Sequence, residues 1–249
     1  MFLSDTSITT IPLIPCTQHA FNDYLSQQSV VTKNWLEQSD FKAKSDSFCL
    51  IPNEKGEIES VLFGVDKTIE YRWALATLAE KLPQGNYRLQ ADWTHEQQQQ
   101  AAVGWGLACY QFDRYKKATR IAPCLLIEKD LDRIQAFVEA ITLTRDLVNV
   151  PAADMMPRDL AEATKALCHR YHADFKQIKG KSLLRKNYPC IHAVGRASAH
   201  TPRLIRLKWG KKSHPKVSLV GKGVCFDTGG LDIKPSQFMR IMKKDMGGA

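Results

Sequence analysis

The stretch that decides the interpretation of this 249-residue sequence is Val220–Ala249, which reads VGKGVCFDTGGLDIKPSQFMRIMKKDMGGA. It follows a short apolar run with the pattern of a strand, and it combines glycines with charged side chains. Glycine lets the backbone turn sharply or approach a ligand closely. Charges beside apolar segments usually need an ionic partner or a metal. The stretch therefore indicates either a metal site or an ion-pair cluster after a strand.

Two nucleotide-binding patterns do not fit this stretch. A phosphate loop needs Gly, four residues, and then Gly-Lys-Ser/Thr. Here Lys216 stands five residues before Gly221, and Gly223 follows Lys222. A dinucleotide-binding fingerprint fails as well, because the sequence contains no GxGxxG.

A metal site fits the residue types better. Asp227 and Asp245 carry oxygen ligands that suit Zn, Mn or Mg. Lys222 can ligate only as the neutral amine, which requires a lowered pKa, and burial and an adjacent metal charge both lower it. Spacing alone leaves a second interpretation open, in which Lys222 and Asp227 form a buried ion pair and Asp245 caps a helix.

The stretch resembles the signature region of the leucyl aminopeptidase (cytosol aminopeptidase) family of two-metal exopeptidases. The family pattern is approximately GKG-x-x-FDTGG-x-x-IKP, followed some residues later by MK-x-DMGGA. The matching segments here are Gly221–Gly223, Phe226–Gly230, Ile233–Pro235 and Met242–Ala249. The resemblance continues upstream to about residue 100, through Gly104–Lys116, Arg145–Asn149, Ala193–Gly195 and Pro202–Leu204.

The resemblance implies a role for each of five side chains. Lys222 would ligate one metal ion through its amine, Asp227 would bridge two metal ions, and Asp245 would complete the first ion's ligands from this stretch. Lys234 would be the catalytic residue, because its charge would stabilise the tetrahedral gem-diolate. Met242 would line the pocket for the first side chain of the substrate, and all five would contact the substrate.

The implied cofactors are two divalent metal ions, Mn or Zn, which would activate a water molecule between them. The family's remaining ligands lie in an Asp-x-Glu-x-Arg motif, whose arginine holds a bicarbonate that serves as the base. This sequence contains no such motif. We therefore expect the chain to hold only part of the active site, as a fragment of a metalloprotease. An inactive fragment is the alternative.

The rest of the sequence predicts an α/β fold with two parts. We expect an N-terminal, macro-domain-like α/β domain over 1–128, then a connecting helix and the incomplete start of a catalytic domain over 129–249. A sheet covered on both faces is favoured because strand-like and helical patterns alternate. The predicted strands are 60–65, 85–92, 123–127, 190–194, 204–209 and 217–220, and the predicted helices are 70–82, 95–110, 129–149 and one beginning near Pro157.

Charge is distributed unevenly along the chain. Residues 1–114 hold 9 Lys and Arg against 14 Asp and Glu, whereas residues 115–249 hold 26 against 12. Such asymmetry is a common sign of nucleic-acid binding. A nucleic-acid-binding module that uses the basic second half, with 176–186 as one basic stretch, is therefore the alternative function. We favour the interpretation that the basic residues pair with acidic groups outside this sequence.

Other features complete the expectation of a cytoplasmic hydrolase that acts on peptides. No apolar window is long enough to span a membrane, and the N-terminus does not have the pattern of a secretory signal. The seven cysteines are scattered singly, which predicts reduced and mostly buried thiols. Cys225 is predicted to be a buried side chain and not a nucleophile. The family resemblance further implies a homo-hexamer for the full-length form.

Overall fold

The structure is a computed structural model that describes residues 1–66, 68 and 70–249. Backbone contacts divide it into two compact units, Met1–Thr142 and Leu143–Ala249. The division falls inside one helix, α5 (Leu131–Asn149), which runs on without interruption. A domain boundary after residue 128, which would assign this whole helix to the second domain, stays a prediction. Each unit is described separately below.

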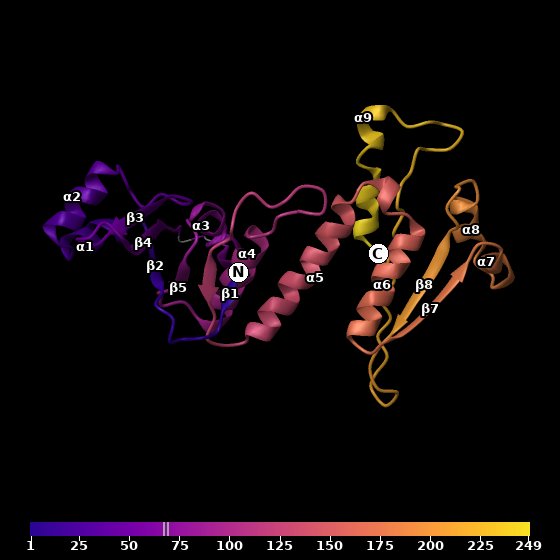
Figure 1. The fold of residues 1–249 in the computed structure, drawn as a ribbon, viewed down its shortest axis with the longest axis horizontal. Helices are drawn as coiled ribbons and strands as arrows, with labels where there is room; N and C mark the ends of the chain where they lie inside the picture. The colour runs from indigo at the N-terminus through magenta and orange to yellow at the C-terminus, as the bar shows by residue number, and fades with distance from the viewer. Residues whose placement is uncertain (67, 69) are drawn as a thin grey trace. The chain divides into compact units, whose positions relative to one another are not determined.

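The N-terminal unit is built on a six-stranded mixed sheet with the order β1-β6-β5-β2-β4-β3 (Figure 1). Neighbouring strands are parallel except for β3, which pairs antiparallel with β4. The strands are β1 (Phe2–Leu3), β2 (Ile11–Cys16), β3 (Phe48–Pro52), β4 (Ile58–Gly64), β5 (Asn86–Leu89) and β6 (Cys124–Leu126).

Helices cover both faces of this sheet, as the alternation of strands and helices predicts. Successive residues of a strand point to opposite faces, and β4 shows this clearly. Val61 packs in a cluster with residues of α3 (Ala76–Lys81) and α4 (His95–Ala108). Leu62 packs in a second cluster, whose helical member Leu36 comes from α2 (Val30–Gln38). The short α1 (Phe21–Ser26) adds Phe21 and Tyr24 to that second cluster.

Helix α4 confirms the helix predicted over 95–110 and begins at a well-formed cap. The Thr94 side chain accepts from the Gln97 amide, and the Gln97 side chain accepts in return from the Thr94 amide. This reciprocal capping box gives hydrogen-bond acceptors to two backbone N–H groups that have none within the helix. Trp105 is fully buried on this helix, with its ring centroid 6.1 Å from that of Tyr87.

The helix predicted over 70–82 forms only in part. Residues Tyr71–Trp73 make a 3₁₀ turn, η1, and α3 follows over Ala76–Lys81. The interruption lies at Leu75, whose ψ of 2° departs from the α-helical value. Leu75, Leu78 and Leu82 are buried as the pattern predicts, but Trp73 is 46% exposed, because it belongs to the separate turn.

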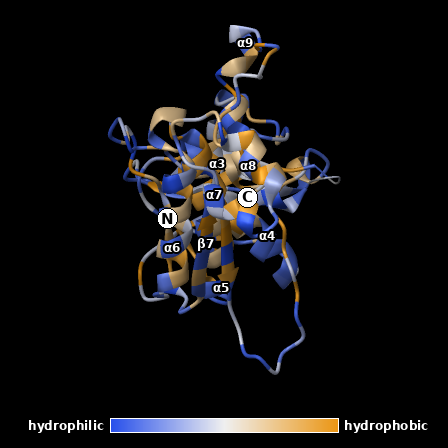
Figure 2. Ribbon diagram, turned by 90° about the vertical axis from the view of Figure 1, so that its right-hand side faces the viewer, coloured by the Kyte–Doolittle hydropathy of each residue, from blue (hydrophilic) through white to orange (hydrophobic). Residues whose placement is uncertain are grey.

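The C-terminal unit has a small antiparallel sheet of β7 (Asp174–Lys179) and β8 (Arg203–Lys208), in register from Asp174–Lys208 to Lys179–Arg203. Helix α6 (Pro157–Arg170) contacts both strands. Its first residue is Pro157, as predicted, because proline suits the first helical position. Hydrophobic and hydrophilic residues both occur along β7 (Figure 2). The other elements are η2 (Ala152–Asp154), α7 (Lys181–Arg185), α8 (Pro189–Gly195), α9 (Ser236–Met239) and η3 (Met242–Gly247).

Two of the predicted strands in this unit are wrong. Residues 190–194 lie in the helix α8, where Pro189 occupies the first turn. A short apolar run cannot by itself separate a strand from a helix. Residues 217–220 form no strand in the described chain, and Leu219 and Val220 are 94% and 97% exposed. A strand exists only through pairing, and the ladder of β7 and β8 does not extend to this run.

Candidate metal centre

The predicted site residues lie on two loops and one 3₁₀ turn that are joined by short backbone contacts. Lys222 forms an antiparallel bridge with Gly248, and Gly229 forms another with Ile233. The first bridge needs glycine at Gly221, because a Cβ there would lie 2.7 Å from the Gly248 carbonyl oxygen. Gly229 has a φ of +103°, and a Cβ there would lie 2.1 Å from the Asp232 carbonyl oxygen. The glycines of the motif therefore permit this close chain packing.

The structure brings four of the five predicted side chains together in two ion pairs, and the fifth, Met242, lies beside one of them. The Lys222 ammonium donates to Asp245 Oδ2, and the Lys234 ammonium donates to Asp227 Oδ2 at 2.5 Å. Lys234 Nζ also lies 3.2 Å from the sulfur of Met242. The spacing of the motif had left open an ion pair between Lys222 and Asp227. In the structure Lys222 pairs with Asp245 instead.

Both carboxylates are held in the ionised form. The hydrogen bond from Lys234, and then the one from the Gly229 amide at 2.8 Å, lower the pKa of Asp227. The hydrogen bond from Lys222 lowers the pKa of Asp245, and the nearby negative charge of Asp227 opposes that lowering. The two carboxylates are therefore close enough for their charges to interact, and both are available as anionic ligands at neutral pH.

These residues fit a divalent metal ion by the chemistry of their donor atoms. Carboxylate oxygens are ligands that divalent ions take, and because each carboxylate is paired with a lysine ammonium, a bound metal ion would have to compete with these ammonium groups. The side chain of Lys222 is 72% exposed, so the described residues do not bury its amine. Burial and a nearby metal charge both favour a lysine as a metal ligand. For Lys222 only the charge of a bound metal ion would do so. Among the described residues, no three His, Cys, Asp or Glu side chains gather in a metal-binding cluster.

Cys225 lies between these residues in the sequence but is not exposed beside them. It is 6% exposed, and burial raises the pKa of its thiol to about 11. A thiol with such a pKa stays protonated at neutral pH and is a poor nucleophile. All seven cysteines are free, five of them buried, which confirms the predicted thiols.

One residue with a clear structural role was missed in the sequence. Lys243 donates its ammonium to the carbonyl oxygens of Asn149 at 2.8 Å and Val150 at 3.4 Å. The pattern MK-x-DMGGA contains this lysine, but the pattern does not show which lysine faces the carboxylates. No local signal could have found it, because the rotation of the turn Met242–Gly247 against α5 is set by tertiary contacts.

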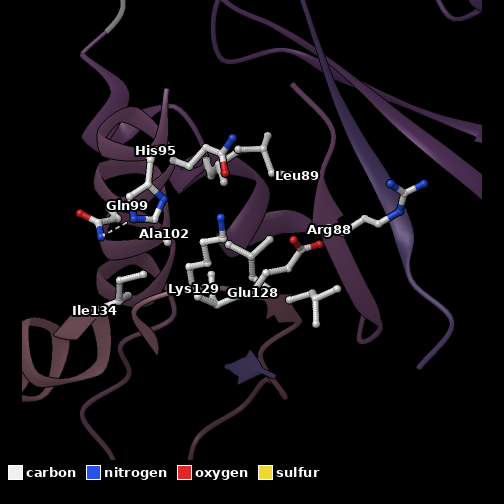
Figure 3. A pocket seen from close by; sticks show the side chains of 13 residues that line it. Arg88, Leu89, His95, Gln99, Ala102, Glu128, Lys129 and Ile134 are labelled. Atoms are coloured by element: carbon white, nitrogen blue, oxygen red, sulfur yellow. Dashed lines mark hydrogen bonds between the residues drawn. The ribbon is translucent and has the colours of Figure 1, made fainter. Parts of the chain in front are cut away.

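The N-terminal unit has a cavity of about 420 Å³ at the carboxyl ends of β5 and β6, beside α4 (Figure 3). Leu125, Ile127 and Ala102 contribute apolar surface. On the polar side, His95 Nε2 and Gln99 Nε2 each lie 2.6 Å from Asp130 Oδ2. These polar groups therefore bond one another, and none of the predicted site residues lines the cavity.

The fold and the site define a mixed α/β protein whose second unit presents paired carboxylates and lysines suited to a divalent metal ion. Two family models match it: "M17 aminopeptidase, N-terminal domain" over residues 11–127, and "Cytosol aminopeptidase family, catalytic domain" over residues 142–249. The chain belongs to the M17 cytosol aminopeptidase family, with an N-terminal domain and part of a catalytic domain. This membership favours an aminopeptidase over a nucleic-acid-binding module.

Individual relatives agree with this assignment. A probable cytosol aminopeptidase of Aquifex aeolicus is 30% identical over 240 residues, covering 87% of this chain and 49% of the relative. The crystal structure of the cytosol aminopeptidase from Coxiella burnetii matches with a TM-score of 0.93 and 40% identity, covering 99% of this chain and 54% of that one. The bottromycin maturation enzyme BotP in complex with Mn matches with a TM-score of 0.76 and 26% identity, covering 97% and 54%.

The matched proteins are longer than this chain. The chain spans between a third and a half of the length of the curated relatives that it matches. Among the described residues, no helix is both long and apolar enough to cross a membrane.

Proposed function

We propose that this chain contributes to a metal-dependent aminopeptidase, which releases N-terminal amino acids of the leucine type from peptides. The observation that carries the proposal is the convergence of Lys222, Asp227, Lys234 and Asp245 in two ion pairs, which the contact of Lys234 with Met242 brings to the same turn as Asp245. Membership of the M17 family supports the reaction class. Manganese and zinc are the proposed metals, and the presence of Mn in the BotP structure supports the first.

Each side chain would have a defined part in this chemistry. Divalent metal ions, when bound, would polarise the scissile carbonyl and activate water for attack. Asp227 and Asp245 would hold them, with Lys222 as a further ligand. Lys234 would keep its proton and donate hydrogen bonds to the oxyanion that develops on the substrate carbonyl. Met242, whose sulfur lies 3.2 Å from Lys234 Nζ, would line the adjoining side-chain pocket.

The test is a calorimetric titration of MnCl₂ into the purified chain and into the variant Asp227→Ala. We expect the variant to bind Mn²⁺ at least about tenfold more weakly, because a carboxylate ligand is lost. Asp232→Ala is the matched control, since Asp232 is an exposed carboxylate of the same loop outside the two ion pairs. Equal Mn²⁺ binding by the wild type and Asp227→Ala would refute the metal assignment.

The activity has its own test, which is the release of leucine from leucinamide by a chain that contains these residues, with and without Mn²⁺. Lys234→Met should lower kcat by at least about a hundredfold while Mn²⁺ still binds, because it removes an oxyanion donor. Unchanged kcat in this variant would exclude the proposed role of Lys234. No step is assigned to bicarbonate, because the sequence contains no Asp-x-Glu-x-Arg motif to hold it.

A homo-hexamer and a cytosolic location are also proposed for the whole enzyme. The resemblance to the leucyl aminopeptidases supports the first, and the names of the relatives as cytosol aminopeptidases support the second. Sedimentation velocity would test the hexamer. A single species at the mass of one chain would contradict it for this polypeptide.

A further inference from the structure

Lys243, the first lysine of the segment Met242–Asp245, is bound to the end of a helix and not to the carboxylates. Helix α5 ends at Asn149, and the Lys243 ammonium donates to the Asn149 and Val150 carbonyl oxygens. The last carbonyls of a helix lack partners within it and carry partial negative charge. Pro151 follows and has no N–H to offer them. A lysine is therefore a well-matched partner for this helix end.

The geometry of the turn η3 explains how neighbouring side chains divide their tasks. A 3₁₀ helix has three residues per turn, so residues i and i+3 share a face. Met242 and Asp245 share one face, where Met242 contacts Lys234 and Asp245 pairs with Lys222. Lys243 and Met246 share the next face, where Lys243 binds the end of α5 and Met246 is only 3% exposed. Lys244 lies on the remaining face and is exposed.

The backbone of Gly247 passes near the same helix, since a Cβ built there would lie 3.4 Å from Cγ2 of Val148. The turn is therefore held on the last residues of α5 by the hydrogen bonds of Lys243. Rotation of the turn about its axis would break these contacts and move Asp245 away from Lys222.

We propose that Lys243 is a positioning residue of the metal centre. It fixes the rotation of the turn Met242–Gly247 on the end of α5, and so presents Asp245 and Met242 to the site without contacting metal or substrate. The effect that we expect on metal affinity rests on the proposed function. The anchoring of the turn stands on the described contacts alone.

The experiment compares Lys243→Met, Lys243→Arg and the matched control Lys244→Met in the same chain. One measurement is calorimetric titration with MnCl₂. The other is amide hydrogen exchange at Gly248 and Ala249, whose N–H groups donate to the Asp245 and Met246 carbonyls. Because exchange needs no metal, it tests the anchor even when the metal assignment fails.

We expect Lys243→Met to weaken Mn²⁺ binding by about tenfold or more, as loss of a supporting contact to a ligand typically does. Exchange at Gly248 and Ala249 should accelerate by a similar factor. Lys243→Arg should restore both, because a guanidinium can also donate to two carbonyls. Lys244→Met should change neither by more than about twofold.

Equal behaviour of Lys243→Met and Lys244→Met in both measurements would overturn the proposal. Faster exchange with unchanged Mn²⁺ affinity would also overturn it, because the anchor would then not serve the metal. If the wild type binds no Mn²⁺, the proposed function fails, and the exchange measurement alone decides the anchor. Should Lys243→Met fail to fold by circular dichroism, Lys243→Gln, which keeps one donor group, takes its place.

Discussion

The two units of this protein differ in where their apolar side chains lie. In the N-terminal unit, buried residues fill two clusters, one on each face of the sheet. In the C-terminal unit, Val217, Leu219, Val220, Leu231 and Ile233 are each at least 72% exposed. Burial of apolar surface is the main source of folding free energy. The first unit is therefore the more densely packed of the two as described, and the candidate metal centre lies on the more lightly packed second unit.

The largest effect should follow from opening the core of the N-terminal unit. Trp105→Ala should lower the free energy of unfolding by about 3–5 kcal/mol, because the indole is fully buried and leaves a cavity. Urea denaturation followed by circular dichroism measures this loss. Leu219→Ala in the C-terminal unit is the control, and its 94% exposure predicts a change within about 0.5 kcal/mol. Equal losses of unfolding free energy in the two variants would contradict the difference in packing between the two units.

The second effect concerns two glycines with left-handed backbone, one in each unit. Gly229→Ala should destabilise the loop that carries Asp227 by about 2 kcal/mol, because both its φ of +103° and the Asp232 carbonyl oppose a Cβ. Gly56→Ala, with a φ of +81° and no atom within 4 Å of a Cβ, should cost only about 1 kcal/mol.

Hydrogen exchange at the Lys234 amide, which donates to Thr228, reports the first loop, and exchange at the Gly56 amide, which donates to Asn53, reports the second. If Gly229→Ala lost less protection against hydrogen exchange than Gly56→Ala, the close packing of the loop that carries Asp227 would be contradicted.

A third test compares two thiols with similar exposure and similar pKa. Cys109 and Cys225 are 5% and 6% exposed, and burial raises the pKa of each to about 11. Their alkylation therefore depends mainly on local opening of the structure. Cys225 should react with iodoacetamide about tenfold faster, because the second unit has fewer buried neighbours to hold it closed. Peptide mass spectrometry at pH 8 measures both rates, and faster reaction at Cys109 would reverse the comparison.

The smallest effect is a dependence of stability on pH in the N-terminal unit. The hydrogen bond from His95 lowers the pKa of Asp130 below the ordinary value of 3.8. A carboxyl whose pKa is lower in the folded state stabilises the fold above its unfolded pKa, and this contribution disappears as pH falls through the folded pKa. Asp130→Asn, which tolerates the φ of 58°, should remove this contribution. The difference in thermal midpoint between wild type and variant should be smaller at pH 3 than at pH 5.

Sequence patterns predicted strands β4, β5 and β6 and helix α4 of the first unit correctly, but they gave no element before residue 60, where the structure has β1, β2, β3, α1 and α2. Strand β4 and helix α4 follow local signals, namely an apolar run and a capping residue before an apolar periodicity. The same reasoning failed at 190–194 and 217–220. Both are short apolar runs, whose state depends on which partner they meet, and no local signal specifies a partner.

The sequence by itself determined the family, the glycines and the residue types of the candidate site, because ligand chemistry and backbone freedom belong to individual residues. It also determined that these residues form a long and specific motif. Only the tertiary structure decided which lysine pairs with which carboxylate. Lys222 pairs with Asp245 and Lys234 with Asp227, while Lys243 turns away to the end of α5. Such choices depend on how a 3₁₀ turn is rotated against a distant helix, and spacing along the chain does not contain that angle.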